Sequence, residues 1–256
     1  MENKIMVNEG LKIKRKIAIL SGKGGVGKST ISLLLTLALA KRNKSVGILD
    51  ADISGASIPK MLNLKGKKPK VSEGKILPIN TKYGIKVISI DFFLESKEAI
   101  IWRGPLKAKA INQFLTQVEW GNLDYLVVDL PPGTGDEALS IASTIKVDGA
   151  IIVTIPSEVS KYIVKKAAYF CKELKIPIIG IVENMSGIVC PKCGNFIEAF
   201  PGNAGEEIAK ELRIKFLGKI PIDPKLSKGL DKGNLEEVEN SKIMQKIVEL
   251  SHTIEK

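Results

Sequence analysis

The 256-residue sequence is poor in the residues that build metal sites and disulfide scaffolds, with three cysteines and one histidine. So few cysteines in a chain of this length argue against a disulfide-stabilised secreted protein, and the expected compartment is the reducing cytoplasm. Aromatic residues make up 5% of the chain and apolar residues 44%, so the core must be aliphatic. Long Ile, Val and Leu runs of this kind fit a parallel sheet that is covered on both faces.

The sequence also lacks a long hydrophobic run. The longest apolar run near the N-terminus, residues 31–40, is too short for a membrane helix, which needs about twenty residues. The same region has no apolar signal-peptide segment. A stable association with membranes is therefore not expected.

Acidic residues are fewer than basic ones: the chain has 28 Asp and Glu residues and 39 Lys and Arg residues, for a formal net charge of +11. Two lysine-rich segments stand out, at 11–16 and 64–70. Such segments either bind nucleic acid and acidic partners or form a solvated surface. Aromatic residues are not interleaved with these lysines as stacking platforms. We therefore expect a solvated surface and no nucleic-acid partner.

Strand-like and helix-like segments alternate along the chain, which predicts right-handed crossovers and a parallel sheet. The expected fold is α/β: a single doubly wound, mostly parallel sheet flanked by helices, in one domain over 1–256. The segments expected to form strands are 16–20, 45–52, 124–130, 149–156 and 176–184, with paired extended segments at 74–80 and 84–90; those expected to form helices are 29–42, 105–118 and 157–174.

Residues 21–30, "SGKGGVGKST", follow an expected strand and open an expected helix. They match the phosphate-binding pattern G-x-x-x-x-G-K-[ST], in which glycines let backbone N–H groups curl around phosphate oxygens. Lys28 is expected to reach the β- and γ-phosphates and the Ser29 hydroxyl to coordinate Mg²⁺. The residues expected to bind the nucleotide are Gly22, Lys23, Gly24, Gly25, Val26, Gly27, Lys28, Ser29, Thr30, Gly133 and Asn184.

Carboxylates follow two other expected strands. Asp129 ends a strand in "VVDLPPGTGD" (127–136) and is expected to hold the magnesium shell, and Gly133 then offers an N–H near the γ-phosphate. Asp52 follows the strand in "LDAD" (49–52) and is expected to orient the attacking water. One Asp at a strand end is often only a helix cap. The phosphate loop and the two carboxylates, taken in order, favour phosphoryl transfer, which depends mainly on positioning and charge neutralisation.

The pair Cys190 and Cys193, in "CPKCG", has a spacing that lets both sulfurs face one metal or cluster. A redox pair, a zinc knuckle and two inert thiols are the alternatives. Neither Cys171 nor His252 belongs to a second paired-ligand motif, so one chain does not easily close a tetrahedral site. Two chains related by a two-fold axis can close such a site, and the shared site suits zinc or an iron–sulfur cluster. Residues 185–200, which carry the pair, are expected to be an irregular insertion beyond a strand's carboxyl end, where open α/β sheets place their sites.

Several of these segments resemble known families. With Lys23 early in the loop, "SGKGGVGKST" resembles the deviant Walker A loop of the MinD/ParA/nitrogenase-iron-protein class. The resemblance implies a face-to-face dimer in which Lys23 reaches the partner's phosphates. Asn184 resembles the adenine-contacting asparagine of that class, although a capping role is equally compatible with the sequence. The guanine-reading N-K-x-D pattern is absent from the sequence, which favours ATP over GTP.

Over roughly residues 12–235 the chain resembles the Mrp/ApbC family of P-loop ATPases, which carry iron–sulfur clusters. The segments that support this are "DADISGASIPKML", "WRGPLKAKAINQF", "DLPPGTGD", "ENMSG" and "CPKCG". The resemblance implies a homodimer with a bridging 4Fe–4S cluster on Cys190 and Cys193, transferred to apo iron–sulfur proteins with ATP hydrolysis coupled to the transfer. No multi-cysteine segment precedes the phosphate loop, so a second stable cluster is not expected.

Two other functions remain open. A MinD/ParA-type positioning ATPase would use a C-terminal amphipathic helix for membranes or a basic face for DNA. The stripe Ile243, Ile247, Leu250 and Ile254 has helical spacing. A helix that packs on the core is favoured, because glutamates and lysines mix on its polar face. The other alternative is a zinc-bridged dimeric ATPase that acts as a scaffold.

Overall fold

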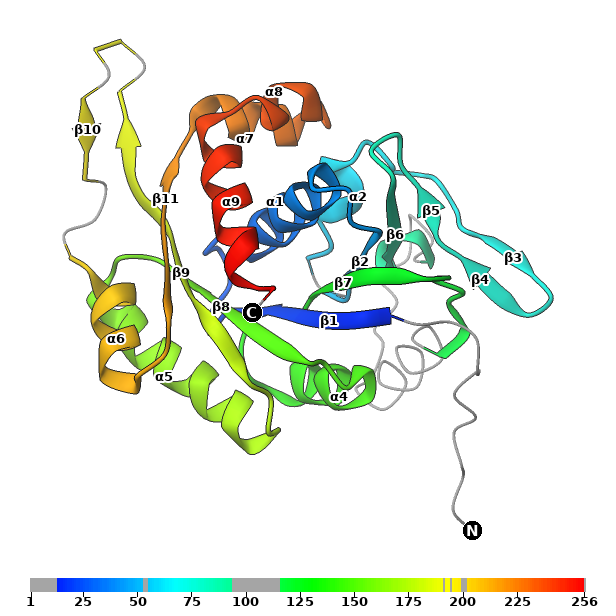
Figure 1. Cartoon of the computed structure of the whole chain (residues 1–256), viewed down its shortest axis with the longest axis horizontal. Coiled ribbons are helices and arrows are strands. Elements are labelled where there is room, and N and C mark those ends of the chain that lie inside the picture. The colour runs from blue at the N-terminus through cyan, green and yellow to red at the C-terminus, as the bar shows by residue number, and fades with distance from the viewer. Residues whose placement is uncertain are drawn as a thin grey trace.

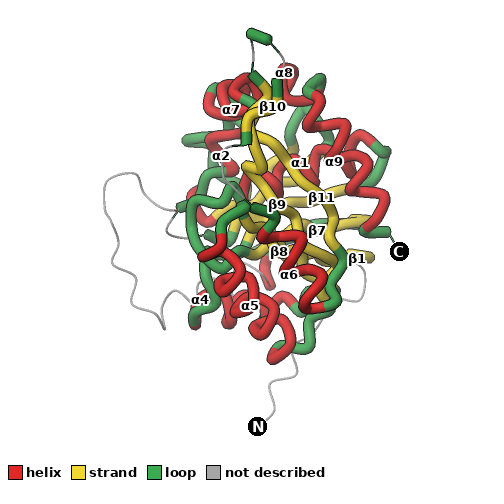
Figure 2. The backbone as a smooth tube through the Cα atoms, turned by 90° about the vertical axis from the view of Figure 1, so that its left-hand side faces the viewer, coloured by secondary structure: helices red, strands yellow, loops and turns green. Residues whose placement is uncertain are grey.

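The computed structural model describes residues 13–52, 55–93, 116–190, 192–193, 195–198 and 202–255. Within them a twisted sheet runs through the molecule with helices on both faces, as Figures 1 and 2 show. The strand order is β10-β9-β8-β1-β7-β2-β6-β5, with β11 also paired to β9. Its strands are β1 (Ile13–Leu20), β2 (Val46–Asp50), β5 (Ile79–Asn80), β6 (Ile85–Ser89), β7 (Leu123–Asp129), β8 (Gly149–Thr154), β9 (Ile178–Val189), β10 (Phe196–Ile197) and β11 (Phe216–Ile222).

The pairing of the strands confirms a mostly parallel sheet. Strand β1 lies between β7 and β8, and all three run parallel. Pairs β2–β6, β2–β7, β8–β9 and β9–β11 are parallel too. Only the short outer strands β5 and β10 run antiparallel within the described sheet. Parallel strands end at one edge, so the carboxyl ends of β1, β2 and β7 come together there.

The helices form one layer on each face of the sheet, and each layer has its own aliphatic core. One layer contains α1 (Lys28–Lys41), α2 (Ile58–Met61), α7 (Pro224–Asp231), α8 (Leu235–Glu239) and α9 (Lys242–Thr253); the other contains α4 (Asp136–Ile145), α5 (Glu158–Glu173) and α6 (Ala204–Leu212). Helix α1 is buried on nearly all sides, because α9 packs on its outer surface. A short 3₁₀ turn, η1 (Ile90–Phe93), follows β6, and a separate two-stranded hairpin joins β3 (Lys70–Ser72) and β4 (Lys75–Leu77).

The expected helices at 29–42 and 157–174 correspond to α1 and α5, whereas most of the helix expected at 105–118 lies outside the described residues. The stripe of α9 packs into the core, since its four residues Ile243, Ile247, Leu250 and Ile254 are at most 5% exposed. Among the described helices, none is both long and apolar enough to cross a bilayer.

The expectation of an irregular insertion at 185–200 is wrong for residues 185–189 and 196–197, which form strands. Strand β9 continues to Val189 and pairs with β10 as an antiparallel hairpin. Met185 lies within the strand but has a φ of 56°, and the pairing with β11 shifts register between Asn184 and Ile188. The hairpin therefore projects from the end of the sheet (Figure 1, β9 and β10).

Candidate nucleotide site and cysteine hairpin

The phosphate loop connects β1 to α1 at the carboxyl edge of the sheet. Gly25 and Gly27 have φ angles of 78° and 79°, in the left-handed region where an L side chain is strained. Gly27 is the residue from which α1 starts, so its conformation turns the chain from the loop into the helix. The loop therefore presents the N-terminus of a fourteen-residue buried helix, a favourable place for an anion.

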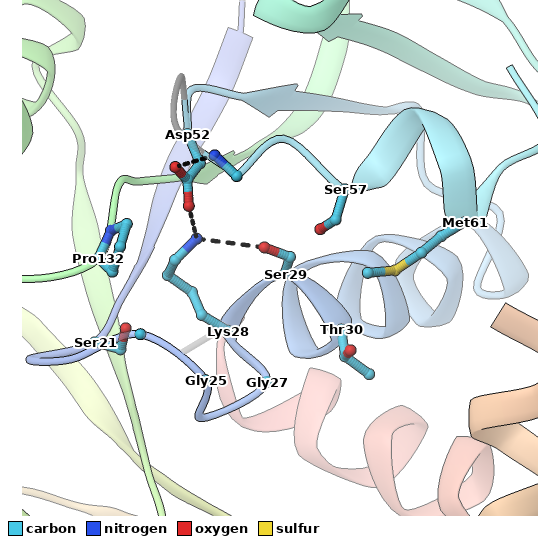
Figure 3. Close-up of a pocket in the computed structure, with 12 residues that line it drawn as sticks. Ser21, Gly25, Gly27, Lys28, Ser29, Thr30, Asp52, Ser57, Met61 and Pro132 are labelled. Atoms are coloured by element: carbon cyan, nitrogen blue, oxygen red, sulfur yellow. Dashed lines mark hydrogen bonds and ion pairs between the residues drawn. The ribbon is translucent and has the colours of Figure 1, made fainter. Parts of the chain in front are cut away.

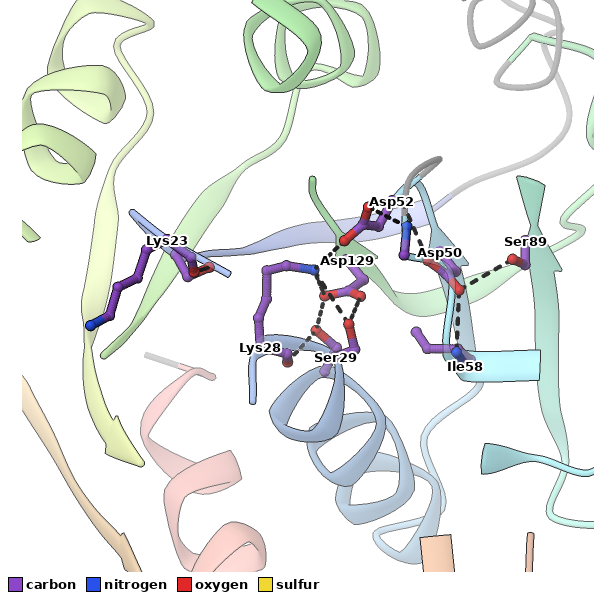
Figure 4. Close-up of polar contacts among 11 residues, drawn as sticks. Lys23, Lys28, Ser29, Asp50, Asp52, Ile58, Ser89 and Asp129 are labelled. Atoms are coloured by element: carbon purple, nitrogen blue, oxygen red, sulfur yellow. Dashed lines mark hydrogen bonds and ion pairs between the residues drawn. The ribbon is translucent and has the colours of Figure 1, made fainter. Parts of the chain in front are cut away.

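Lys28, the first residue of α1, reaches the carboxylate at the end of β7. Its Nζ donates to Asp129 Oδ1 at 2.8 Å, and the Ser29 hydroxyl donates to Asp129 Oδ2 at 2.5 Å. The Ser32 hydroxyl, one turn further along α1, donates to Oδ1 at 2.7 Å. Asp129 is fully buried. Because β7 lies beside β1 in parallel register, the structure brings together Lys28, Ser29 and Asp129 as the sequence predicts (Figure 4).

Asp52 lies on the other side of the lysine. Its Oδ2 is 3.8 Å from Lys28 Nζ, and its Oδ1 accepts a bond from the Gly55 N–H at 3.0 Å. Figure 3 shows this carboxylate facing the lysine from across the site. The structure therefore places the residue predicted to orient water next to the lysine predicted to bind phosphate.

Sequence reasoning missed Asp50 and Ser32. Asp50 ends β2 directly beside Asp129 on β7, and it is fully buried. Its Oδ2 faces the Ile58 N–H and the Ser89 hydroxyl at 3.3 and 3.2 Å. Burial, and then the nearby negative charge of Asp129, raise the pKa of Asp50 to about 7. The signal was present, since "LDAD" carries two carboxylates, but only strand register shows that the first one faces Asp129.

A cavity of about 430 Å³ opens beside these groups. It is lined by Ser21, Gly24, Gly25, Gly27, Lys28, Ser29, Thr30, Asp52, Gly55, Ser57, Met61 and Pro132. Most of the lining belongs to the predicted loop, whereas Gly55, Ser57, Met61 and Pro132 were not predicted. Ser57 precedes the short helix α2 and Met61 is its last residue, and Figure 3 shows both on the side of the cavity nearest Thr30.

Two further predicted residues are Lys23 and Gly133. The Lys23 side chain points away from Lys28 and Asp129, as Figure 4 shows. The Gly133 N–H donates to the Ser21 carbonyl at 2.8 Å. For this N–H to contact a γ-phosphate, that bond has to break. Gly133 has a φ of 88°, a conformation that glycine adopts at little cost.

Asn184 lies within β9 rather than at the end of a strand. Its side-chain N–H donates to the Val26 carbonyl at 2.9 Å, and the side chain is 7% exposed. A Cβ at Gly27 would lie 2.2 Å from the Asn184 amide nitrogen. Asn184 therefore supports the phosphate loop from behind, and its contact with a base stays a prediction.

The two predicted cluster ligands lie at the tip of the β9–β10 hairpin. Cys190 is half-buried and Cys193 is exposed, and the Cys190 N–H donates to the Asn195 carbonyl at 2.8 Å. Hydrogen bonds from the Cys193 N–H, the Lys192 N–H and the Cys193 side chain lower the pKa of the Cys190 thiol. A lower pKa favours the thiolate, which is the form that binds metals.

The third cysteine has the opposite environment. Cys171 is fully buried in α5, and burial raises the pKa of its thiol to about 12. Within the part of the chain that the structure describes, no group of three or more His, Cys, Asp or Glu side chains is placed to share a metal ion.

The sequence matches the family described as "ParA: NUBPL iron-transfer P-loop NTPase" over residues 12–255. A relative from Methanocaldococcus jannaschii, named "Iron-sulfur cluster carrier protein", is 55% identical over 87% of this chain and 77% of its own length. A relative of the same name from Saccharolobus solfataricus is 47% identical over 86% of this chain and 75% of its own length.

Solved structures agree with this assignment. A nucleotide-binding protein in complex with ADP from Archaeoglobus fulgidus has a TM-score of 0.79 at 44% identity, covering 88% of this chain and 89% of that one. The cell division ATPase MinD of Pyrococcus furiosus has a TM-score of 0.71 at 23% identity, covering 94% and 98%, and shares the fold. The phosphate loop, the strand order and these likenesses together show that the chain belongs to the NUBPL iron-transfer family of P-loop NTPases.

Proposed function

We propose that this protein is an ATP-binding and ATP-hydrolysing iron–sulfur cluster carrier of the cytoplasm. Its homodimer holds a 4Fe–4S cluster between the two subunits and transfers it to apo iron–sulfur proteins. The names of the relatives from M. jannaschii and S. solfataricus support the cargo. The observation that carries the proposal is the position of Cys190 and Cys193, at the tip of a hairpin that projects from a P-loop NTPase sheet.

The hairpin suits a shared and labile site. Each chain supplies two thiols at an exposed tip, while Cys171 is buried in α5 and cannot take part. Two copies of the tip across a two-fold axis supply four thiolates, the usual ligand set of a 4Fe–4S cluster. Because the ligands face solvent and few groups support them, the cluster is expected to leave readily.

The nucleotide site supplies the groups that ATP hydrolysis needs. Lys28 and the loop N–H groups bind the phosphates, and Asp52 orients the attacking water. Lys23, which points away from its own site, reaches the phosphates of the partner subunit. Each subunit therefore completes the other's site only in the closed dimer.

Magnesium fits the oxygen donors beside Lys28. The Ser29 hydroxyl and the Asp129 carboxylate are adjacent, and oxygen ligands of this kind are the ones that Mg²⁺ prefers. The ion would supply positive charge that neutralises the phosphates during hydrolysis. Asp129 must then exchange part of its present hydrogen bonding with Lys28 and Ser29 for the ion.

Quantification of iron, sulfide and protein on one anaerobically reconstituted sample tests the cargo. We expect four irons and four sulfides per two chains (on the order of one cluster per dimer). Cys190→Ala and Cys193→Ala should each lose nearly all of the cluster, because symmetry removes two of the four ligands at once. Cys171→Ala is the matched control and should retain it. A cluster that persists in Cys193→Ala contradicts the bridging arrangement.

Transfer to an apo iron–sulfur enzyme, with and without ATP, tests the carrier role. Recovery of the recipient's activity with loss of cluster from the donor supports it. A colourless dimer that retains zinc through this assay, and never loads iron, supports the scaffold instead. The membrane-binding form of the positioning-ATPase alternative has less support, because the apolar stripe that would contact a membrane is buried in the core.

A further inference from the structure

A basic groove lies at the other end of the sheet from the cysteine hairpin. It has a volume of about 470 Å³ and is lined by Lys67, Lys68, Lys70, Leu77, Pro78, Ile79 and Asn80. These residues belong to the loop before β3, to β3 and to the segment from β4 to β5. Figure 1 shows β3 and β4 on the opposite side of the molecule from β10. The groove is therefore separate from the nucleotide and cluster sites.

The groove carries positive charge that nothing in the described chain neutralises. Lys65, Lys67, Lys68 and Lys70 are all exposed, and among the described residues none of their ammonium groups forms an ion pair. The nearby Lys75, by contrast, forms an ion pair with Glu119 at 3.6 Å. Four like charges within six residues repel one another, and an acidic ligand relieves that repulsion.

Part of the groove's lining is apolar. Leu77, Pro78 and Ile79 are all partly exposed in it. Phosphates gain nothing from such apolar surface, whereas the side chains of a peptide do. Among the described residues no aromatic side chain lines the groove, so the described lining lacks the stacking platform that single-stranded nucleic acids use. Lysine charge and aliphatic surface in one lining together fit a polypeptide that carries carboxylates and apolar side chains.

From the sequence alone the lysines of 64–70 were expected to form only a solvated surface. Because the structure places them beside apolar lining residues in a groove, we propose instead that this groove docks an extended acidic segment of a partner protein. The carboxylates of the segment pair with Lys67, Lys68 and Lys70, and its apolar side chains lie against Leu77 and Ile79. The proposal is independent of the cluster-carrier function, so either can fail without the other.

Fluorescence anisotropy tests the proposal with a labelled peptide composed of Glu, Leu and Gly. The peptide should bind the wild-type protein and lose affinity as salt is raised, because exposed charges are screened. The variant Lys67→Glu/Lys68→Glu/Lys70→Glu should bind at least about tenfold more weakly, since three surface ion pairs become repulsive. Unchanged ADP affinity in this variant verifies that it is folded.

A matched control separates the groove from net charge. Lys225, Lys228 and Lys246 are also exposed and have no ion pair within the described part of the chain. Their triple Glu variant carries the same net charge and should bind the peptide within about twofold of wild type. A second peptide, with every Leu replaced by Ser, should bind at least about fivefold more weakly, because it cannot use the apolar part of the lining.

Three results would overturn the proposal. The first is no binding of the Leu-containing peptide to the wild-type protein at low salt. The second is an equal loss of affinity in the two triple variants, which would reduce the effect to net charge. The third is tighter binding of duplex DNA than of the peptide, lost in the groove variant, which would assign the groove to nucleic acid.

Discussion

Gly27 and Asn184 are 157 positions apart and meet behind the phosphate loop, and their contact makes a quantitative prediction. In Gly27→Ala, the new methyl group would lie 2.2 Å from the Asn184 amide nitrogen, so Asn184 must move. Movement breaks its bond to the buried Val26 carbonyl. The left-handed backbone at φ 79° adds a separate cost.

The two costs can be estimated. An L side chain in the left-handed region costs about 1–2 kcal/mol, and leaving the buried Val26 carbonyl unpaired costs about 1–3 kcal/mol. Gly27→Ala should therefore lower the free energy of unfolding by about 2–5 kcal/mol, the sum of both. Asn184→Ala should lower it by about 1–3 kcal/mol, since it only removes the hydrogen bond.

The double variant Gly27→Ala/Asn184→Ala is the decisive measurement. The bond to Val26 can be lost only once, so the double variant should be about as stable as Gly27→Ala alone. The coupling free energy should then be about 1–3 kcal/mol, well above the ~0.3–0.5 kcal/mol expected for independent sites. Chemical denaturation without nucleotide gives all four free energies of unfolding.

Gly25→Ala supplies the matched control. Gly25 has nearly the same φ, 78°, but a Cβ there meets nothing within 4 Å. Gly25→Ala should therefore lower the free energy of unfolding by the backbone cost alone and combine additively with Asn184→Ala. Additive behaviour of Gly27→Ala with Asn184→Ala, within the same margin as the control, would refute the contact.

Three further predictions concern the nucleotide site and the thiols. Asp52→Asn should bind ATP with near-normal affinity but hydrolyse it at least about tenfold more slowly, because water positioning is lost while the loop and Lys28 remain; a normal steady-state rate of phosphate release contradicts this role. Lys23→Ala should bind nucleotide but hydrolyse it poorly, and mixing it with Asp52→Asn chains should restore activity at one of the two sites of a verified heterodimer, whereas no recovery argues against action across the dimer. In the cluster-free native protein at pH 8, a thiol reagent should modify Cys190 and Cys193 within minutes and Cys171 only after unfolding, because burial raises the pKa of Cys171 to about 12; rapid modification of three thiols contradicts the buried environment.

The sequence by itself determined the phosphate loop and the elements around it. The glycines, Lys28 and Ser29 are contiguous, so the chemistry of the loop is visible without knowledge of the fold. The long aliphatic runs likewise determined buried strands and α1, because burial on both faces requires them. Even the place of Asp129 beside Lys28 followed, since carboxyl ends of parallel strands share one edge.

Only the tertiary structure decided how distant residues complete the site. Asp50 faces Asp129 because β2 and β7 pair in that register, and a register slip of one residue would turn it away. Asn184 supports Val26 because β9 passes behind the loop, and the sequence predicted for it only a base contact or a cap.

The structure of the cysteine hairpin likewise could not be predicted from the sequence. Residues 185–189 look irregular in sequence, yet β9 continues because β11 pairs with it on one side and β10 on the other. The position of Cys190 and Cys193 on a projecting tip is thus set by hydrogen bonds from segments that follow later in the chain. Local sequence encodes loops and helix starts, whose interactions are short in range, whereas strand length and register depend on neighbours that only the folded chain brings together.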